Sequence, residues 1–402
     1  MTNSDKAGSQ DSESSNIPTR DELVSRARDL VPTLLERAER QAAARSLLPE
    51  TAADLQKAGF YRVLQPRKWG GYEMHPSVYT DIQMVLSEGD VSVGWVYGVL
   101  VVHSFHLALF DDRLAESVWG EDSTVLISSS YLPAGVAKRV DGGFRLSGHW
   151  KFSSGCDHCG WAMLGGRIEG TDPPVTGTFV VPLSDYEIVD TWNVSGLKGT
   201  GSNDIIVDDV FLPEYGFLAS ADYTHVKGPG LAVNTGTLFR APMMQLFYRC
   251  VNTAAIGGLQ GMLNEFLGYG ATRVNAFGSK TTTDPDARLA VAAAVSLIDE
   301  LKLVLRRNFD HIMECAERGE VPSDTDRLRF KYQAADVPHR CGEVAMRLFK
   351  AGGGSAIFDS RTFGRNLNDI LAIGQHAANQ SQIYGRNYGG TLFGEVSTDP
   401  SF

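Results

Sequence analysis

The sequence predicts an α+β protein in which an N-terminal α-helical domain, a central antiparallel β-barrel or sandwich and a C-terminal four-helix bundle follow one another. Three observations lead to this prediction. Apolar residues recur at helical spacing up to about residue 121, short β-rich segments follow up to about residue 214, and helical spacing returns from about residue 242. A chain of 402 residues is also too long for one simple core, so a division into domains is expected.

The composition excludes several classes of protein. Hydrophobic residues make up 43% of the chain and charged residues 21%, which is typical of soluble globular domains. No apolar run reaches the length of about 18 residues that a membrane span needs. The net charge of −11 argues against a nucleic-acid groove, which requires a basic surface. Five cysteines without a secretory signal indicate reduced thiols and a cytoplasmic protein.

The N-terminal helical domain is expected over residues 19–121. Residues 1–18 are polar and Ser-rich, so we expect a disordered tail there and neither a signal peptide nor a transit peptide. Thr19 or Asp21 can cap a long amphipathic helix, which Pro32 would kink or divide. Further helices are expected over residues 49–58, 77–88 and 91–110. The last of these is apolar nearly all round, as in a helix buried within a bundle.

The central β domain is expected over residues 122–214. Segments such as TVLISSSYLP, FRLSGHWKFSS and TGTFVVPL are short, rich in strand-forming residues and bounded by Gly, Pro, Asp or Asn. This pattern is typical of antiparallel strands. The sequence DGG at Asp141–Gly143 is a strong signal for a hairpin between two of them.

Residues 215–402 are expected to form the C-terminal helical bundle, with an irregular segment at the end. Long helices joined by short connections are typical of an up-and-down bundle. The predicted helices span residues 243–274, 284–318, 324–351 and 367–383.

The stretch FSSGCDHCGW, residues 152–161, raises the question of a metal or redox site. It places Cys156, His158 and Cys159 within four residues. A structural zinc site needs a second pair of ligands, and the remaining cysteines are isolated on predicted helices. A thioredoxin-type Cys-x-x-Cys would open a helix in a βαβ unit, whereas this one follows a predicted hairpin. We therefore expect no metal, and interpret the two cysteines as small residues in a turn.

Phosphate-binding and serine-nucleophile motifs are also missing. The glycine clusters GGLQG, AGGGSA and GTGSN do not follow a strand and open a helix, so a nicotinamide site is not expected, and there is no G-x-S-x-G elbow. The remaining candidates are polar residues at positions where apolar ones are expected. They are His103 in an apolar helix, Ser128–Ser130 and Ser153–Ser154 at strand ends, and His376 near the end of the final helix. Each alone is weak, since a lone buried histidine is more often a core residue.

Taken in order, these segments resemble the acyl-CoA dehydrogenase superfamily over about residues 20–390. The matching motifs are LQPRKWGGYE, LSGHWKFSSG, GLKGTGSNDIIVDDVFLP and ATRVNAFG. Within the superfamily, HLALFDDRLAESVWGED, LISSSYLPAG, FSSGCDHCGW and QHAAN are most similar to the oxygenase components of two-component flavin-dependent aromatic hydroxylases, of the p-hydroxyphenylacetate and secosteroid phenol hydroxylase type. The dehydrogenases carry a catalytic glutamate where this chain reads GQHAAN, so abstraction of an acyl-CoA α-proton is not expected.

The resemblance implies three catalytic residues. His376 matches the histidine placed near the C4a–N5 edge of the flavin, where it protonates the peroxide or stabilises the hydroxyflavin. His103 and Ser129 match the positions that hold the phenolic oxygen of the substrate, with a neutral His103 accepting the phenol proton. Close relatives often carry an Asp after the HAAN segment, and this chain has Gln380 there, so no role is carried over to that position.

The resemblance also implies the cofactor-binding residues. Ser154 matches the position whose backbone or hydroxyl contacts the N5/O4 edge of the flavin. Arg273 matches an arginine that contacts the flavin phosphate, often across a subunit interface. Ser153, Phe152 and Trp150 are the other candidates on the same strand. For Phe152 and Trp150, packing on the isoalloxazine or the substrate and packing in the protein core are equal alternatives.

The function implied is that of an oxygenase component. It would receive FMNH2 or FADH2 by diffusion from an NAD(P)H-dependent flavin reductase, form a C4a-hydroperoxyflavin with O2, and hydroxylate a phenolic or related aromatic substrate. The alternatives are N- or S-oxygenation in the same fold, acyl-CoA dehydrogenation or oxidation, and non-catalytic flavin binding. A homotetramer follows from the resemblance alone. Residues 215–242 and 384–402 are expected to line or cover the pocket and to select the substrate.

Overall fold

The computed structural model describes residues 17–274, 278–399 and 401, so the predicted tail lies almost entirely outside the described residues. The N-terminal helices are α1 (Arg20–Ala44), α2 (Pro49–Lys57), α3 (Ser77–Gly89), α4 (Val91–Leu107) and α5 (Asp112–Trp119). The strands are β1 (Ile127–Val140), β2 (Gly143–Ser153), β3 (Trp161–Ile168), β4 (Thr176–Pro182), β5 (Glu187–Val189), β6 (Asn203–Pro213) and β7 (Phe217–Ala219). The C-terminal helices are α6 (Ser220–Thr224), α7 (Met243–Cys250), α8 (Thr253–Gly270), α9 (Pro285–Glu317), α10 (Asp324–Ala335), α11 (Val337–Gly352), α12 (Thr362–Ile373) and α13 (Ser381–Leu392).

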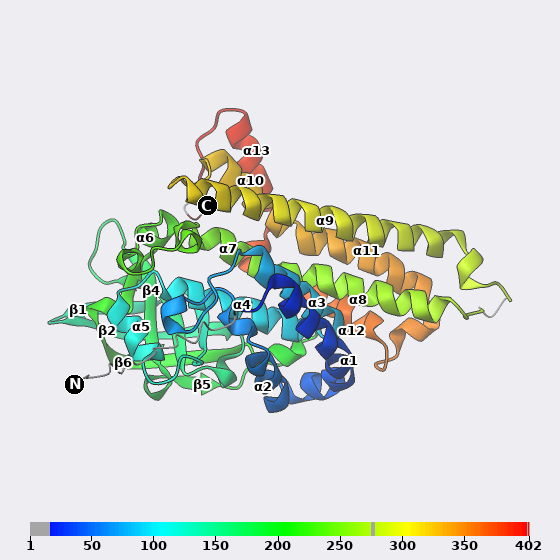
Figure 1. Cartoon of the computed structure of the whole chain (residues 1–402), viewed down its shortest axis with the longest axis horizontal. Coiled ribbons are helices and arrows are strands. Elements are labelled where there is room, and N and C mark those ends of the chain that lie inside the picture. The colour runs from blue at the N-terminus through cyan, green and yellow to red at the C-terminus, as the bar shows by residue number, and fades with distance from the viewer. Residues whose placement is uncertain (1–16, 275–277, 400, 402) are drawn as a thin grey trace, which may run out of the picture.

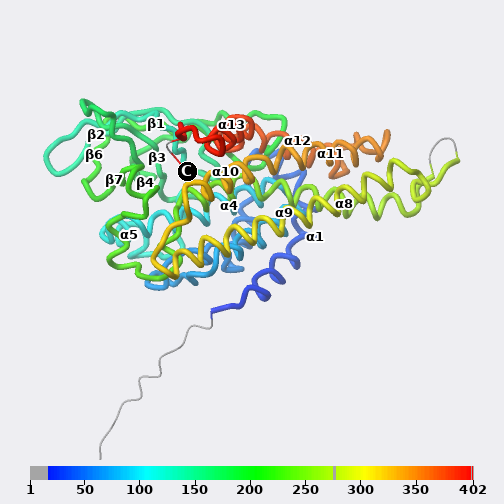
Figure 2. Tube along the Cα trace, turned by 90° about the horizontal axis from the view of Figure 1, so that it is seen from above, coloured from blue at the N-terminus to red at the C-terminus, as the bar shows by residue number. Residues whose placement is uncertain are grey.

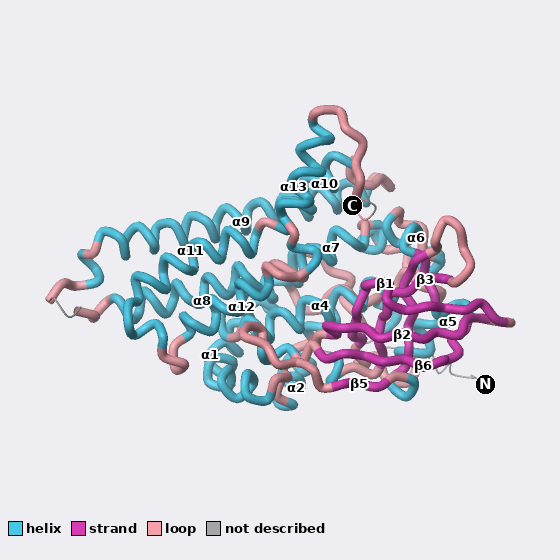
Figure 3. The backbone as a smooth tube through the Cα atoms, turned by 180° about the vertical axis from the view of Figure 1, so that it is seen from behind, coloured by secondary structure: helices cyan, strands magenta, loops and turns pink. Residues whose placement is uncertain are grey.

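The strands gather at one end of an elongated molecule, and helices make up the rest (Figures 1 and 3). Seen from above, α8, α9 and α11 extend away from the strands toward the opposite end (Figure 2). Helix α4 lies between the sheet and the bundle (Figure 1). None of the described helices combines the length and the apolar character that crossing a bilayer requires. The predicted fold class, with a helical region before and after a sheet, is confirmed.

The sheet connects the two helical regions. Within the described residues its strand order is β5-β6-β2-β1-β3-β4-β7. The hairpin predicted from DGG is confirmed, because Val140 pairs with Gly143 and Gly142 takes the left-handed conformation, with φ 74°. The expectation of purely antiparallel strands is wrong at one place, since β1 and β3 run parallel. The 3-10 turn at Cys156–His158 and the extended residues after it carry the chain across from β2 to β3.

The N-terminal helices form largely where their residues predict. Thr19 caps α1 in a reciprocal capping box with Glu22, and the helix continues through Pro32 without ending. Helix α4 starts at Asp90, whose side chain accepts the Ser92 N–H, and every residue of α4 is buried. This agrees with its apolar sequence. A continuous core surrounds α4 and extends into both helical regions, whereas the β domain has a separate core.

Three predicted C-terminal helices are in fact divided. Residues 243–274 form α7 and α8, with a break at Val251–Asn252, and residues 324–351 form α10 and α11, with Pro338 in the first turn of the second helix. Residues 367–383 are divided where Gly374 follows α12. His376 therefore lies in a connection, and the expectation that it lies in a helix is wrong.

The C-terminal tail is held by a buried ion pair. The Lys331 ammonium on α10 donates to the Asp399 carboxylate over 2.6 Å, and the two side chains are 2% and 8% exposed. Lys331 also donates to the Ser401 hydroxyl at 2.9 Å and lies over the rings of Tyr248 and Tyr384. Burial lowers the pKa of Lys331, while Asp399 opposes this effect. The tail thus closes over α7 and α10.

Removal of the Asp399 carboxylate is expected to release the tail. In Asp399→Ala the Lys331 ammonium would stay buried without its counter-ion, which costs about 3 kcal/mol or more unless water reaches it. Hydrogen exchange at residues 391–399 should therefore accelerate by about tenfold or more. The additional change Lys331→Met should restore slow exchange, and Glu395→Ala, which removes a charge from the same tail, should leave it unchanged. Equal exchange in Asp399→Ala and wild type would contradict the role of this ion pair.

Candidate active site

Helix α4 carries polar side chains into the region between the sheet and the C-terminal helices. Trp95, His103 and His106 are 5%, 1% and 0% exposed. Because α4 packs against β1 and α7, these side chains meet residues from distant parts of the sequence. A buried polar atom is costly unless it is hydrogen-bonded, so the partners of each one determine what it can still bind.

The hydrogen bond of His103 fixes its tautomer. Its Nδ1 lies 2.6 Å from the carbonyl oxygen of Ile127. A carbonyl can only accept, so Nδ1 carries the proton and Nε2 presents a lone pair. That Nε2 is buried without a hydrogen-bond partner among the described residues. Burial lowers the pKa of His103 to about 4, so the side chain is neutral at pH 7 and ready to accept a hydrogen bond.

Ser129 stands between Ile127 and Tyr131, the two β1 residues that contact His103. Residues 127, 129 and 131 point to one face of the strand, and the Tyr131 ring on this face contacts the His103 ring with centroids 5.9 Å apart. Ser130 points away and donates to the Lys151 carbonyl at 2.8 Å. By this alternation, Ser129 is the one of the three consecutive serines on the face that carries the Tyr131 ring.

His376 is fixed in the opposite tautomer. Its Nδ1 accepts the backbone N–H of Ala378 at 3.1 Å, so Nδ1 is unprotonated and Nε2 carries the proton. The ring lies edge-on to Trp95 at 5.6 Å and near Phe247 at 6.2 Å. Burial lowers the pKa of His376 to about 4, so it is a neutral N–H donor at pH 7. Trp95 is thus the contact through which α4 reaches the connection between α12 and α13.

Ser154 belongs to a chain of hydroxyl groups with a fixed direction. Thr200 donates its only hydroxyl proton to the Leu197 carbonyl at 2.9 Å. Ser202, 2.7 Å from Thr200, must therefore donate to Thr200, and Ser154, 2.8 Å from Ser202, must donate to Ser202. The Trp95 indole N–H donates to the Ser154 oxygen at 2.9 Å. The Ser154 oxygen keeps one lone pair and has no proton to offer, so it can accept one further hydrogen bond.

A bulge near the end of β2 changes the direction of the strand just before Ser154. The pairing with β6 shifts between Trp150 and Ser153, and Phe152 between them has φ 67°, which is strained for a residue other than glycine. Phe152 is 59% exposed and packs edge-on against Trp192. The Ser153 hydroxyl is buried without a partner among the described residues. Phe152 is thus an open aromatic surface beside the buried hydroxyls of Ser153 and Ser154.

Trp150 and Arg273 lie apart from this group. Trp150 is 1% exposed in the core of the β domain and donates to the Gly165 carbonyl at 2.7 Å, which is the core-packing alternative left open by the sequence. Helix α8 ends at Gly270, remote from the strands (Figure 1). Arg273 follows three residues later and donates to the Ala351 carbonyl at 3.0 Å. Within one chain it does not meet the other candidates. Residues 275–277 of its motif lie outside the described residues.

The Cys-Asp-His-Cys turn has structural contacts. His158 Nε2 lies 3.1 Å from the Leu47 carbonyl, and the Ser46 hydroxyl donates to Asp157 at 2.8 Å, so the turn packs on the α1–α2 connection. Burial raises the pKa of Cys156 to about 12 and raises that of Cys159 as well, whereas a redox-active thiol needs a lowered pKa. No cluster of three or more His, Cys, Asp or Glu side chains suited to a metal ion occurs in the described part of the chain.

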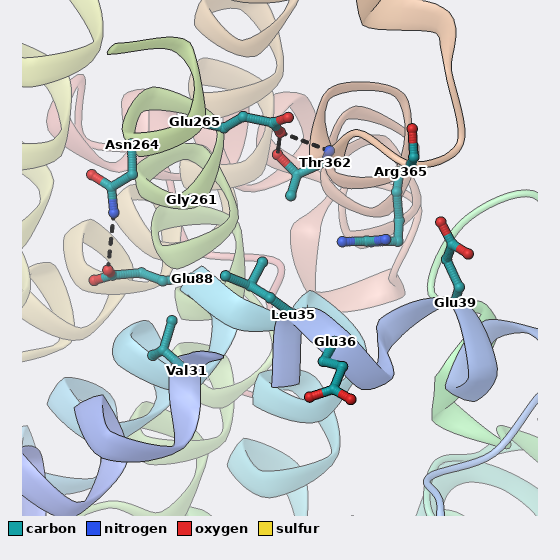
Figure 4. A pocket seen from close by; sticks show the side chains of 11 residues that line it. Val31, Leu35, Glu36, Glu39, Glu88, Gly261, Asn264, Glu265, Thr362 and Arg365 are labelled. Carbon is teal, nitrogen blue, oxygen red and sulfur yellow. Dashed lines mark hydrogen bonds between the residues drawn. The ribbon is translucent and has the colours of Figure 1, made fainter. Parts of the chain in front are cut away.

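A large cavity lies elsewhere. Its volume is about 620 Å³, and it opens between α1, α8 and α12 (Figure 4). Its charged lining consists of four glutamates and one arginine, namely Glu36, Glu39, Glu88, Glu265 and Arg365. It contains none of the polar atoms described above. The candidate site is recognised instead by buried groups whose hydrogen bonds are incomplete.

Known proteins resemble this chain over most of its length. Residues 250–381 match the family "Acyl-CoA dehydrogenase, C-terminal domain". The flavin-dependent monooxygenase oxygenase subunit HsaA of Rhodococcus jostii (strain RHA1) is 36% identical over 374 residues, which are 92% of this chain and 98% of that protein. The crystal structure of 3-HSA hydroxylase from Rhodococcus sp. RHA1 matches with a TM-score of 0.92 at 34% identity, covering 96% of this chain and 100% of that one. The chain belongs to the oxygenase subunits of flavin-dependent monooxygenases.

A more distant relative agrees with the two-component organisation. The oxygenase component of p-hydroxyphenylacetate 3-hydroxylase from Acinetobacter baumannii is 25% identical over 382 residues, or 94% of this chain and 90% of that protein. The resemblance predicted from the sequence is therefore confirmed. An oxygenase component of this kind works with reduced flavin, which a partner reductase supplies.

Sequence reasoning missed four residues near the candidates. Trp95 and Ser202 hydrogen-bond to Ser154, and Thr200 hydrogen-bonds to Ser202. His106 hydrogen-bonds to Tyr131, whose ring contacts His103. His106 had a usable signal, because it stands one turn after His103 in the same apolar helix. The Thr200–Ser202 chain had only the motif GTGSN, whose glycines drew attention to phosphate binding instead.

The lowered pKa values of His103, His106 and His376 predict that the oxygenase loses stability in mild acid. Burial lowers the pKa of His103 and His376 to about 4 and that of His106 to about 3, from an ordinary 6.5. Between pH 6.5 and 4 the unfolded chain thus binds more protons than the folded chain. As the pH falls through this range, each histidine lowers the free energy of unfolding by up to about 1.4 kcal/mol per pH unit. Their full stabilisation is present above pH 6.5.

Urea unfolding at several pH values checks this prediction. Asp369 acts in the opposite direction, since burial raises its pKa to about 7 and its protonation then favours the folded state as the pH falls. The wild type is therefore compared with His103→Asn, which lacks one titrating group. The variant should lose less free energy between pH 6.5 and 5 than the wild type. Equal losses would show that His103 is not buried in its neutral form.

Proposed function

We propose that this oxygenase hydroxylates a phenolic or related aromatic substrate, using O2 and a reduced flavin delivered by a separate NAD(P)H-dependent reductase. The observation that carries the proposal is the opposite hydrogen-bonding state of two neutral histidines, the buried His103 and the part-buried His376. His103 presents an acceptor nitrogen and His376 presents a donor N–H. Transfer of an oxygen atom to a phenol needs both, since one group draws on the phenolic proton and another supplies a proton to the oxygen atom left behind.

The substrate hydroxyl is proposed to bind between His103 and Ser129. The lone pair on His103 Nε2 would accept the phenolic O–H, which increases the electron density of the ring and favours attack on an electrophilic oxygen. Ser129, on the adjacent face of β1, would orient the phenolic oxygen. A histidine with a pKa of about 4 stays neutral over the physiological range, so the acceptor is always present.

The groups near Ser154 fit a reduced flavin. Ser154 offers a lone pair to an N–H such as that of N5 in reduced flavin. His376 offers an N–H, and its ring contacts Trp95, which is hydrogen-bonded to Ser154. Phe152 offers an exposed ring on which the isoalloxazine can pack. When bound, reduced flavin supplies the two electrons that allow one atom of O2 to enter the substrate and the other to leave as water. The buried Trp95 ring would help to keep solvent protons away from this edge.

The remaining features are proposed from the family. Arg273 would contact the flavin phosphate of a neighbouring subunit in a homotetramer, which fits its distance from the other candidates within one chain. The reductase would deliver flavin by diffusion, in a cytoplasmic setting. Either FMN or FAD would serve.

The test uses the purified full-length protein with reduced FMN or FAD, isotopically labelled O2, and a panel of phenols, indoles and polycyclic aromatics. A hydroxylated product that carries the label supports the proposal. Oxygen-independent oxidation of an acyl-CoA with an electron acceptor would overturn it, and so would failure to bind reduced flavin. A labelled N-oxide or S-oxide without ring hydroxylation would assign the protein to the alternative chemistry.

His376→Ala is expected to uncouple the reaction. Without the N–H near the flavin edge, more O2 should leave as hydrogen peroxide, and the ratio of product to peroxide should fall by about tenfold or more. His311→Ala, which changes a histidine on α9 remote from Trp95, provides the control. An unchanged ratio in His376→Ala would remove the role proposed for this residue.

Ser202→Ala is expected to change which flavin redox state binds. In the wild type, Ser154 can only accept, which favours the N–H at N5 of reduced flavin over the acceptor nitrogen of oxidised flavin. Loss of Ser202 frees the Ser154 proton, so the affinity for oxidised flavin should rise by about tenfold, the equivalent of one hydrogen bond. Titrations with oxidised flavin and, under anaerobic conditions, reduced flavin measure both values. Ser130→Ala, outside the hydroxyl chain, should alter neither. No gain for oxidised flavin in Ser202→Ala would refute the direction of the chain.

A further inference from the structure

His106 is a second histidine of α4 that the proposed mechanism does not use. It is 0% exposed and lies one helical turn after His103, about 4.5 Å further along the axis. Its Nδ1 lies 2.8 Å from the Tyr131 hydroxyl. Its ring is surrounded by aromatic rings, with centroid distances of 5.3 Å to Phe110, 5.4 Å to Tyr131 and 4.8 Å to Tyr223.

The other ring nitrogen of His106 has nothing to bind. Nε2 is buried and has no hydrogen-bond partner among the described residues. Leaving a buried polar atom unsatisfied costs about 1–3 kcal/mol. A position of this kind calls for an explanation, and the usual ones are a ligand, an ordered water or a functional role. An apolar side chain could pack among the same three aromatic rings without this cost.

His106 and His103 lie on the same face of α4 and contact the same tyrosine ring. Residues i and i+3 lie on one face of a helix, and the Tyr131 ring touches both imidazoles, at 5.9 Å and 5.4 Å between centroids. Each histidine uses Nδ1 for a contact with β1 and leaves Nε2 unsatisfied. The two free nitrogens therefore mark two points along one face of α4.

The surroundings of His106 are uncharged. Desolvation, reinforced by His103, lowers its pKa to about 3, so the ring is neutral. Its described contacts are aromatic rings and a phenolic hydroxyl, without a carboxylate, ammonium or guanidinium group. The Tyr223 hydroxyl, on α6, is itself bonded to Ser220 at 3.0 Å. A charged group placed here would lose its hydration without gaining a counter-ion.

We propose that His106 is a second substrate-binding residue, and that its Nε2 hydrogen-bonds an uncharged polar group at the end of the substrate remote from the hydroxyl held by His103. The proposal rests on the proposed function, because it takes His103 as the residue that binds the reacting hydroxyl. The substrate class becomes narrower as a result. It is an extended, neutral aromatic with a second hydrogen-bonding group, which Tyr223 and Phe110 flank with their rings.

Three naphthols that share one scaffold test the proposal. The ligand 2-naphthol has one hydroxyl, 2,6-dihydroxynaphthalene has a second neutral one, and 6-hydroxy-2-naphthoate has an anion in its place. Calorimetric titration of the full-length protein without flavin gives the three affinities. The diol should bind about tenfold more tightly than 2-naphthol, the equivalent of one hydrogen bond, and the carboxylate should bind more weakly than the diol.

Two amide variants of His106 separate its two nitrogens. The amide of His106→Gln reaches the region of Nε2 but not that of Nδ1, while the amide of His106→Asn reaches the region of Nδ1 and keeps the contact with Tyr131. His106→Gln should retain most of the preference for the diol, and His106→Asn should lose it while binding 2-naphthol with nearly the affinity of the wild type. Thermal unfolding and the 2-naphthol affinity report whether each variant is folded.

The outcomes distinguish this proposal from the proposed function. Absence of any preference for the diol in the wild type would overturn it, as would an undiminished preference in His106→Asn. If either variant fails to fold, the preference of the wild type still decides, as does a comparison with Tyr223→Phe, which should keep that preference. Hydroxylation by the wild type with reduced flavin and O2 is measured separately. A result that overturns the role of His106 would therefore not count against the monooxygenase activity.

Discussion

The complete burial of α4 is the constraint on which the rest of the structure depends. A helix enclosed by the sheet and the C-terminal helices cannot satisfy polar side chains with bulk water, so each of them must find a partner in the protein or remain unsatisfied. Trp95 finds the Ser154 hydroxyl and His103 finds the Ile127 carbonyl. These bonds connect α4 to the strands, and the atoms that α4 leaves unsatisfied are the ones to which we propose that a ligand binds.

The chemistry follows from hydrogen-bond directions more than from charge. His103 and His376 are both neutral at pH 7, and their backbone partners, a carbonyl in one case and an N–H in the other, make one an acceptor and the other a donor at Nε2. In the same way, the Leu197 carbonyl sets the direction of the hydroxyl chain that ends at Ser154. Backbone groups are held by secondary structure, so these directions do not depend on pH over the physiological range.

The sequence predicts the layers and most of the candidates, because these depend on local patterns. The buried character of α4 and the DGG hairpin are visible as runs of residues. The breaks before α8, α11 and α13 are not, since the helical pattern continues across them and only tertiary contacts select the break. For the same reason, no pattern shows which nitrogen of His103 is protonated, or that GTGSN contributes two hydroxyls beside Ser154.

The buried polar atoms without hydrogen-bond partners lower the stability of the folded protein at the candidate site. Within the described residues, the Nε2 atoms of His103 and His106 and the Ser153 hydroxyl are buried without partners, and the cost of each is about 1–3 kcal/mol. Phe152 adds backbone strain at the bulge that directs Ser154. Apolar residues would pack better at most of these positions. These groups lie on α4 and at the end of β2, among the residues that we propose to bind the substrate and the flavin, and a ligand bound there would supply the missing hydrogen bonds.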